Sequence, residues 1–438
     1  MNEQVTSRVQ EYLNRIHYLD LSGDACFFRV ECSLWRILSV GRNAPLIPSL
    51  RILEIHYETA DPRILDVTTF IPILSPSIRE IRIMEDHSNV HCINILTLFH
   101  LLKSSRCNPH TLSFCVPYHA DIPQSIHSCF PELRSLAFGY FREHYPQSRN
   151  GTITLPDILN ALPSLEYLQV DLRALPLPRR TTPVVTHPCL EILYLEGHPR
   201  DFELILPGCR FPHLVYSSYT IHKPSSLDWS PFIDGIARCS PKLHDLDIEI
   251  KPTDALISKK LCFDDLQPLF RFQITEFGLR NVDVSFSIQE VELMLRQWTH
   301  LRNLELTSSD VSSRSPDGDP MYDAAILVAL GKHCNLRDVK IDLDFRTLAD
   351  SDLRSGVFSL GAQSSLNTLR IRTAENFPEE MVPIYLLARN ILEIFPDVHI
   401  LYEGEDEGLK KRFDEFWKFL ALLKKESEPS LVTRHSSG

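Results

Sequence analysis

One pattern of apolar and polar positions recurs along the whole chain. Its clearest copy places Leu243, Leu246 and Ile248 at the first, fourth and sixth positions, with polar residues between them. Because side chains alternate between the two faces of a strand, this spacing predicts a short strand with one apolar face. The other clear copies begin at Ile16, Leu50, Ile78, Leu133, Leu165, Leu190, Leu301, Leu336 and Leu366, and weaker copies contain Leu112, Leu214, Ile274 and Phe395.

The spacing between successive copies predicts the architecture. They stand roughly 29 residues apart on average, near the upper end of the leucine-rich-repeat period. Segments with helical apolar spacing lie between them, so strand and helix alternate. The sequence therefore predicts an α/β fold, a leucine-rich repeat solenoid (horseshoe) with a parallel sheet on the concave face and helices on the convex face. The predicted helices are 33–40, 64–74, 92–104, 155–162, 228–239, 287–298, 323–333 and 379–395.

Two local signals support these boundaries. Ser287 and Glu290 form a capping-box sequence, which fixes the start of the helix after them. Proline precedes the strand start by two residues in half of the repeats, where it ends one helix and tolerates the first strand position. These prolines are Pro48, Pro76, Pro131, Pro163, Pro188, Pro212 and Pro241.

The same pattern predicts the boundaries of the parts of the chain. Residues 1–15 read as an N-terminal helical lead-in, and 16–402 as one solenoid of about 14 irregular repeats. Residues 403–426 read as an amphipathic helix that caps the open end of the core, and 427–438 as a disordered tail. Two segments interrupt the regular alternation of strand and helix: a polar insertion at 307–320 and a proline-stiffened connection at 175–183.

Composition narrows the class of protein. The formal net charge of −12 argues against a general nucleic-acid binder. The N-terminus lacks the apolar run of a secretory signal, and no stretch is long and apolar enough to span a membrane. Cysteines recur just before the strands, which predicts reduced thiols packed into the core of a cytoplasmic or nuclear protein. They are Cys107, Cys129, Cys189, Cys209, Cys239 and Cys334.

The residues that lead into the strands resemble those of a known family. Leu162-Pro-Ser-Leu-Glu-Tyr-Leu168 and Cys334-Asn-Leu-Arg-Asp-Val-Lys-Ile341 are similar to entries in F-box/leucine-rich repeat proteins, in the divergent form of mushroom-forming fungi. The resemblance covers roughly 16–402, and it implies the substrate-recognition half of a ubiquitin-ligase receptor. The F-box itself, usually announced by Leu-Pro-x-Glu-Leu, is not seen, since the first repeat begins at Ile16. A Skp1-type adaptor and cullin are therefore expected partners only if an F-box lies upstream.

Strand alternation also predicts which side chains face the concave surface. The residues two, four and six positions after the start of each copy should point there, away from the core. An exposed row of aromatic, acidic and basic side chains is typical of a protein-binding surface, although aromatic neighbours on adjacent strands also stabilise a sheet by themselves. The candidate partner-binding residues are Tyr167, Ile192, Tyr194, Tyr216, Asp245, Asp247, Glu249, Arg370 and Arg372.

No motif in the sequence predicts catalysis. Phosphate-binding loops, nucleophile elbows and metalloprotease motifs are absent. His187, Cys189, His198, Cys209 and His213 include metal-ligand types, but their spacing matches no zinc pattern. We therefore expect a non-catalytic protein-protein interaction module, a monomer without metal or cofactor that binds neither nucleic acid nor membrane. The alternative is a stand-alone scaffold or enzyme regulator with no ubiquitin link.

Overall fold

The computed structural model describes most of the chain, and its contacts divide it into two compact units. Unit 1 is Met1–Tyr219 with Gly235–Lys242, and unit 2 is Thr220–Asp234 with Leu243–Gly438. The described residues are 3–23, 34–40, 44–57, 67–85, 94–115, 122–139, 154–175, 184–222, 224, 227–251, 259–308, 322–323, 326–345, 365–375, 377, 379–404 and 406–427.

Unit 1 is built on a sheet to which eight described strands contribute in chain order. The strands are β1 (Tyr18–Gly23), β2 (Ile52–Tyr57), β3 (Glu80–Glu85), β4 (Thr111–Cys115), β5 (Ser135–Phe138), β6 (Tyr167–Asp171), β8 (Ile192–Gly197) and β10 (Tyr216–Ile221), the last of which ends across the division. The pairs from β1 through β8 are parallel. Two short strands, β7 (Val185–Thr186) and β9 (Cys209–Arg210), pair outside this sheet.

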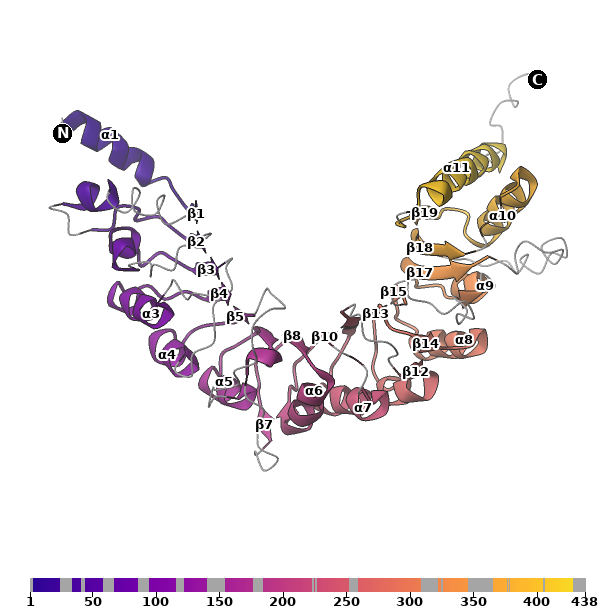
Figure 1. Ribbon diagram of the computed structural model, residues 1–438, viewed down its shortest axis with the longest axis horizontal. Helices are drawn as coiled ribbons and strands as arrows, with labels where there is room; N and C mark the ends of the chain where they lie inside the picture. Colours follow the sequence, from indigo (N-terminus) through magenta and orange to yellow (C-terminus); the bar gives the residue numbers. More distant parts are fainter. Residues whose placement is uncertain are drawn as a thin grey trace, which may run out of the picture. The chain divides into compact units, whose positions relative to one another are not determined.

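Helices of unit 1 follow one another along one side of its sheet (Figure 1). The sequence-adjacent helices α3, α4 and α5 pack in order, as expected when each repeat stacks on the last. The helical elements are α1 (Glu3–Leu13), an α-helical segment at 34–39, η1 (Val67–Ile73), α3 (Ile95–Ser104), α4 (Ile122–Cys129), α5 (Leu155–Ala161), η2 (Leu172–Ala174), α6 (Pro199–Ile205) and η3 (Leu206–Gly208).

Unit 2 repeats the plan with six described strands in order, each pair parallel. They are β11 (Asp245–Ile250), β13 (Glu276–Arg280), β15 (Asn303–Leu306), β17 (Asp338–Asp344), β18 (Thr368–Glu375) and β19 (His399–Tyr402), with β16 (Tyr322–Asp323) beside β17 and a separate pair β12 (Leu261–Cys262) with β14 (Val284–Ser285). The helices are α7 (Trp229–Cys239), which the division crosses, η5 (Phe263–Leu269), α8 (Ile288–Gln297), α9 (Ile326–Gly331), α10 (Met381–Ile394) and α11 (Glu407–Ser427).

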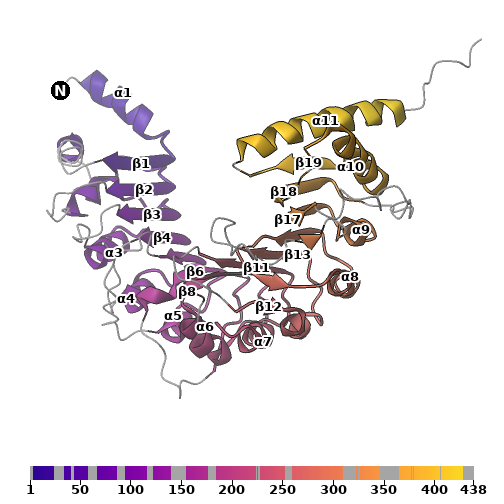
Figure 2. The same ribbon diagram turned by 45° about the vertical axis from the view of Figure 1, so that its right-hand side comes forward.

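The last helix of unit 2 lies beside β19 and α10 (Figure 2). Its Phe413 ring stacks on Tyr402 of β19 at 4.7 Å and on Phe377 at 4.4 Å between ring centroids. Phe413, Phe416 and Leu420 are buried along one side of α11. The amphipathic pattern of this segment is thus used to bury apolar surface of the final repeat.

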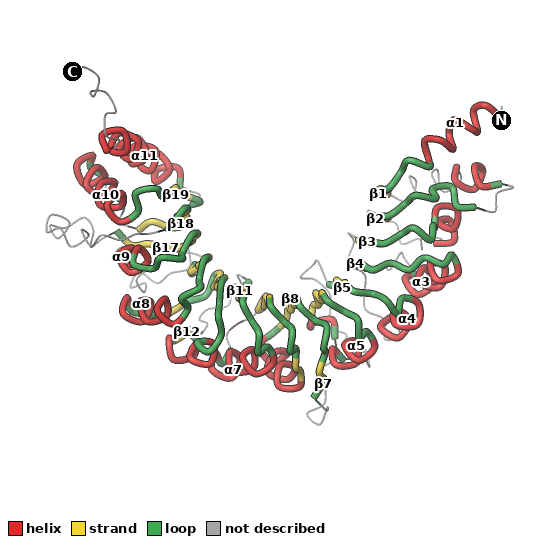
Figure 3. Tube along the Cα trace, turned by 180° about the vertical axis from the view of Figure 1, so that it is seen from behind, coloured by secondary structure: helices red, strands yellow, loops and turns green. Residues whose placement is uncertain are grey.

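Because the strands pair in parallel register, the equivalent apolar residue of each repeat lies in the same layer of the core. In unit 2, Leu246, Phe277, Leu304, Val339, Leu369 and Ile400 are partners on successive strands, and all are buried. Leu53, Ile81, Leu112, Leu136, Leu168 and Leu193 form the matching layer of unit 1. The predicted strand phase is therefore confirmed, and each unit is an α/β leucine-rich-repeat solenoid in which strands and helices alternate (Figure 3).

The helix predictions were incomplete. The capping box is confirmed, since the Glu290 N–H donates to Ser287 Oγ at 3.3 Å and the Ser287 N–H donates back to Glu290 Oε2 at 2.6 Å. Within the segment predicted as a helix over 64–74, the described residues form a 3-10 helix at Val67–Ile73, which contains Pro72. Helices α4 and α6 were not predicted. Most of 307–320 and 175–183, and the tail after 427, lie outside the described residues.

The prediction of inward-packed cysteines is right at four positions and wrong at two. Cys107, Cys129, Cys209 and Cys239 are buried, whereas Cys189 and Cys334 are exposed. Cys107 follows Arg106, whose φ of 57° turns the chain inward so that the thiol donates to Ser75 O. The other two stand in turns that direct their side chains outward, so proximity to a strand start is not enough to place a cysteine inside.

Candidate functional site

Three tyrosine rings touch on the side of the unit 1 sheet that no described helix covers. We call this side of each sheet its open face. The Tyr194 ring lies 5.5 Å from the Tyr167 ring and 5.1 Å from the Tyr216 ring, tilted by 43° and 42°. All three side chains are half-buried, as is Ile192. Tyr167, Ile192, Tyr194 and Tyr216 therefore form one continuous surface, the tyrosine cluster.

The strand register explains why these rings meet. Tyr167 is the partner of Ile192, and Gln169 is the partner of Tyr194. Glu191 O accepts the N–H groups of Val215 and Tyr216, just as Glu166 O accepts those of Glu191 and Ile192. Tyr216 thus occupies the same strand position as Ile192 and Tyr167. Because neighbouring strands lie about 4.8 Å apart, a ring two residues further on the middle strand reaches both outer rings.

Polar groups border the tyrosine cluster. The Tyr167 hydroxyl donates to Gln169 Oε1 at 3.0 Å, and burial together with nearby Tyr194 raises the pKa of Tyr167. Further along the same strands, Arg173 donates to Asp171 Oδ2 at 2.8 Å and to Glu196 Oε1 at 2.7 Å. Burial raises the pKa of Asp171, although Arg173 acts in the opposite direction. The tyrosine cluster is therefore an aromatic surface that borders the ion pairs of Arg173 with Asp171 and Glu196.

The three acidic candidates lie in unit 2, and one of them is not exposed as expected. Asp245 accepts from the Thr275 hydroxyl, and Glu249 pairs with Lys251 at 3.0 Å. Asp247 is only 9% exposed and pairs with Arg280. Its burial raises its pKa, against the effect of Arg280.

A glycine on the next strand explains the burial of Asp247. Its partner on β13 is Gly278, and a Cβ atom at that position would lie 2.6 Å from Asp247 Oδ1. Because Gly278 has no side chain, the Asp247 carboxylate occupies the space beside it and contacts Arg280. The alternation rule placed Asp247 on the correct face, but it could not show that a neighbouring side chain is absent.

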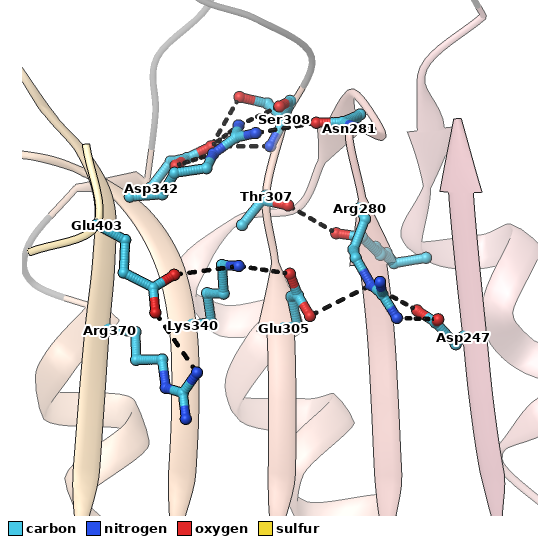
Figure 4. Close-up of polar contacts among 12 residues, drawn as sticks. Asp247, Arg280, Asn281, Glu305, Thr307, Ser308, Lys340, Asp342, Arg370 and Glu403 are labelled. Atoms are coloured by element: carbon cyan, nitrogen blue, oxygen red, sulfur yellow. Dashed lines mark hydrogen bonds and ion pairs between the residues drawn. The ribbon is translucent and has the colours of Figure 1, made fainter. Parts of the chain in front are cut away.

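The open face of unit 2 carries a chain of ion pairs (Figure 4). Arg280 contacts Glu305 at 3.4 Å as well as Asp247, and Lys340 contacts Glu305 at 3.4 Å and Glu403 at 3.2 Å. Glu403 also contacts Arg370 at 3.4 Å. Asp247, Arg280, Glu305, Lys340, Glu403 and Arg370 thus form a series of alternating charges across the strands, which we call the charge ladder.

The two arginine candidates differ in environment. The Arg370 side chain is 47% exposed and stands at the end of the charge ladder. The Arg372 side chain is 24% exposed and donates to both carboxylate oxygens of Asp342, at 3.1 and 2.7 Å, to Asn281 Oδ1 at 2.9 Å, and to Ser308 O. Since the Asp342 side chain is only 3% exposed, Arg372 neutralises a buried charge. Its guanidinium therefore joins neighbouring repeats of unit 2.

A further polar group was missed at the start of unit 1. Glu54 is buried and accepts from the Tyr18 hydroxyl at 3.0 Å, while its carboxylate also contacts His56 at 3.0 Å and Arg82 at 3.3 Å. The hydrogen bond to Glu54 raises the pKa of Tyr18. Asp20, Glu54 and Arg82 are partners on β1, β2 and β3, so the repeat alignment contained a signal for this group.

The described residues contain no group of three or more histidine, cysteine or acidic side chains that could hold a metal ion. Within the same residues no helix is long and apolar enough to cross a bilayer. The His187 Nε2–H donates to Leu162 O at 2.8 Å, and burial lowers the pKa of His187.

Comparison with known proteins adds little to this picture. No protein-family model matches the chain, and no curated protein matches it. A solved structure, the mouse RP105/MD-1 complex, is similar over 84% of this chain with 13% sequence identity and a TM-score of 0.35. The match spans 66% of that chain's length. At this TM-score the likeness carries no argument about function, and the repeat architecture follows from the strand order and register.

Proposed function

We propose that this chain is a non-catalytic protein-interaction module and that its partner contacts the tyrosine cluster. The contiguous contact of three half-exposed tyrosine rings on an open sheet face supports this most strongly. Leu168 and Leu193, on the opposite face of the same strands, already fill the core. The tyrosine rings are therefore not needed to form it. Tyrosine is enriched among the residues that dominate binding energy, because a large rigid ring loses little entropy on binding.

The family resemblance suggests a more specific role. In that role the chain is the substrate-recognition half of an F-box ubiquitin-ligase receptor, working as a monomer in the cytoplasm or nucleus. A Skp1-type adaptor and cullin would then bind through an F-box upstream of the repeats. The alternative is a stand-alone scaffold or a regulator of an enzyme, which would use the same face without a ligase.

Quantitative affinity purification tests both levels of the proposal. The tagged wild-type chain is compared with the Tyr167→Ala, Tyr194→Ala, Tyr216→Ala triple variant and with Tyr12→Ala, which changes an exposed tyrosine on α1. We expect a protein retained by wild type and by Tyr12→Ala to be lost from the triple variant, provided its circular dichroism spectrum is unchanged. Equal recovery from all three contradicts the proposed site. Recovery of that protein without adaptor or cullin favours the scaffold.

A further inference from the structure

The surroundings of the tyrosine cluster carry more negative than positive charge. Glu166 and Glu191 stand immediately before β6 and β8, and Asp171 and Glu196 stand near their ends, in register with each other. Among the described residues, Arg134 lies 3.3 Å from Glu166, and Arg173 is shared by Asp171 and Glu196. Within the described part of the chain, these four carboxylates therefore meet two arginines. Glu191 is exposed and forms no ion pair with any residue that the structure describes.

We infer that the tyrosine cluster receives a cationic side chain, arginine before lysine, from the partner protein. The inference rests on the proposed function and names the partner's chemistry. The face of a tyrosine ring is electronegative, so it attracts a cation placed over it. Two rings tilted against Tyr194 offer adjoining faces, and the surplus carboxylates on both sides add a favourable potential.

Arginine fits this surface better than lysine for two reasons. Its planar guanidinium stacks on an aromatic ring while its N–H groups still reach a carboxylate at the rim, here Glu191 or Glu196. It is also less strongly hydrated than an ammonium, so less is lost when the rings displace its water. A purely aliphatic or proline-rich segment would cover the rings but would bring no positive charge to balance the surrounding carboxylates. A nucleic-acid strand could stack on the rings, but its phosphates would be repelled by these carboxylates.

A displayed library of random twelve-residue peptides tests the inference on the full chain. Peptides are selected on the wild type after depletion on the Tyr167→Leu, Tyr194→Leu, Tyr216→Leu variant, whose leucines keep an apolar surface without ring faces. We expect the retained peptides to be enriched in arginine and poor in acidic residues. For one such labelled peptide, Tyr194→Phe should keep the affinity within about twofold, and Tyr194→Leu should weaken it by about fivefold or more.

Charge is tested with a matched pair of variants. Glu191→Gln should weaken binding of the arginine peptide and reduce its dependence on salt, because it removes an uncompensated charge beside the rings. Glu203→Gln on α6, an exposed acid on the helix side of the same unit, should change neither. Retained peptides that depend on the tyrosines but lack arginine and lysine overturn the cation inference and leave the interaction site standing. Peptides retained equally by the leucine variant, or no retained peptides, count against both.

Discussion

At the scale of single residues, strand alternation separates side chains that hold the fold from those that do not. Tyr194 and Leu246 lie on opposite faces of their sheets. Since Tyr194 is half-buried between two rings, Tyr194→Ala should cost about 1 kcal/mol, somewhat more than an isolated surface change. Chemical denaturation followed by circular dichroism measures this. A loss several times larger would place the ring in the core of unit 1.

Leu246→Ala should have the larger effect. The side chain is 1% exposed and its partner on the next strand is Phe277, so truncation leaves a cavity. We expect a destabilisation of about 2–5 kcal/mol, as for other buried leucines. The same denaturation experiment checks it, and a cost below that of Tyr194→Ala contradicts the strand phase.

Arg370 and Arg372 occupy similar positions in the sequence, but their contacts differ. We therefore expect different losses of stability when each is replaced. Arg372→Met should destabilise unit 2 by about 3 kcal/mol, because it leaves the buried Asp342 carboxylate without its cation. Arg370→Met should cost less than about 1 kcal/mol, since its pair with Glu403 is solvated. Thermal melts of the two variants compare them directly. Equal shifts would mean that the Arg372 contacts do not carry stability.

At the scale of elements, helix starts can be tested one at a time. The Ser287 side chain accepts from the Glu290 N–H at the first turn of α8. Ser287→Ala should therefore cost about 1 kcal/mol, whereas Ser287→Asp, which can accept the same hydrogen bond, should cost little. Hydrogen exchange of the α8 amides measures the effect locally. Unchanged exchange in Ser287→Ala would show that the cap does not stabilise the helix.

Elements were predictable where a pattern was long enough to repeat. The 1-4-6 spacing and its weaker copies located each described strand of the two sheets except β16, because a buried parallel ladder requires the same apolar position in each repeat. Helices α4 and α6 were missed because they offer few apolar positions for a helical period, Ile122 and Ile126 in α4 and Phe202 and Ile205 in α6, whereas the equally short α5 has Leu155, Ile158 and Leu159. Of the site, alternation predicted that the tyrosines share a face. It could not predict the charge ladder, since Arg280, Glu305 and Lys340 come from three different repeats and their long side chains select partners only in the folded state.

At the scale of the whole molecule, both units contain the same acid-sensitive feature. His187 in unit 1 and His333 in unit 2 each contact a carbonyl of an earlier repeat, Leu162 O at 2.8 Å and Trp298 O at 3.2 Å. Burial lowers the pKa of both rings. The folded chain therefore keeps them neutral at a pH where the unfolded chain, with an ordinary histidine pKa of about 6.5, takes up protons.

The sign of the pH dependence follows from this difference. The unfolded state binds more protons below about pH 6.5, so stability should fall as the pH drops through that value, by at most about 1.4 kcal/mol per pH unit for each histidine. Melting temperatures between pH 7.5 and 5.5 measure the slope. His187→Asn with His333→Asn should flatten it, and His127→Asn, an exposed position on α4, should not. A slope unaffected by the double variant rules out these two histidines as its source.

The proposed binding site for a partner protein is the open face of unit 1, over the tyrosine cluster. Site-specific photocrosslinking tests it most directly, with a benzophenone amino acid placed at Ile192, inside the cluster, or at Ile71, an exposed apolar position on the helical side of the same unit. We predict that illumination in cells joins a partner protein to the chain labelled at position 192 and not to the chain labelled at position 71. A partner joined at position 71 alone, or equally at both, would contradict binding at the tyrosine cluster.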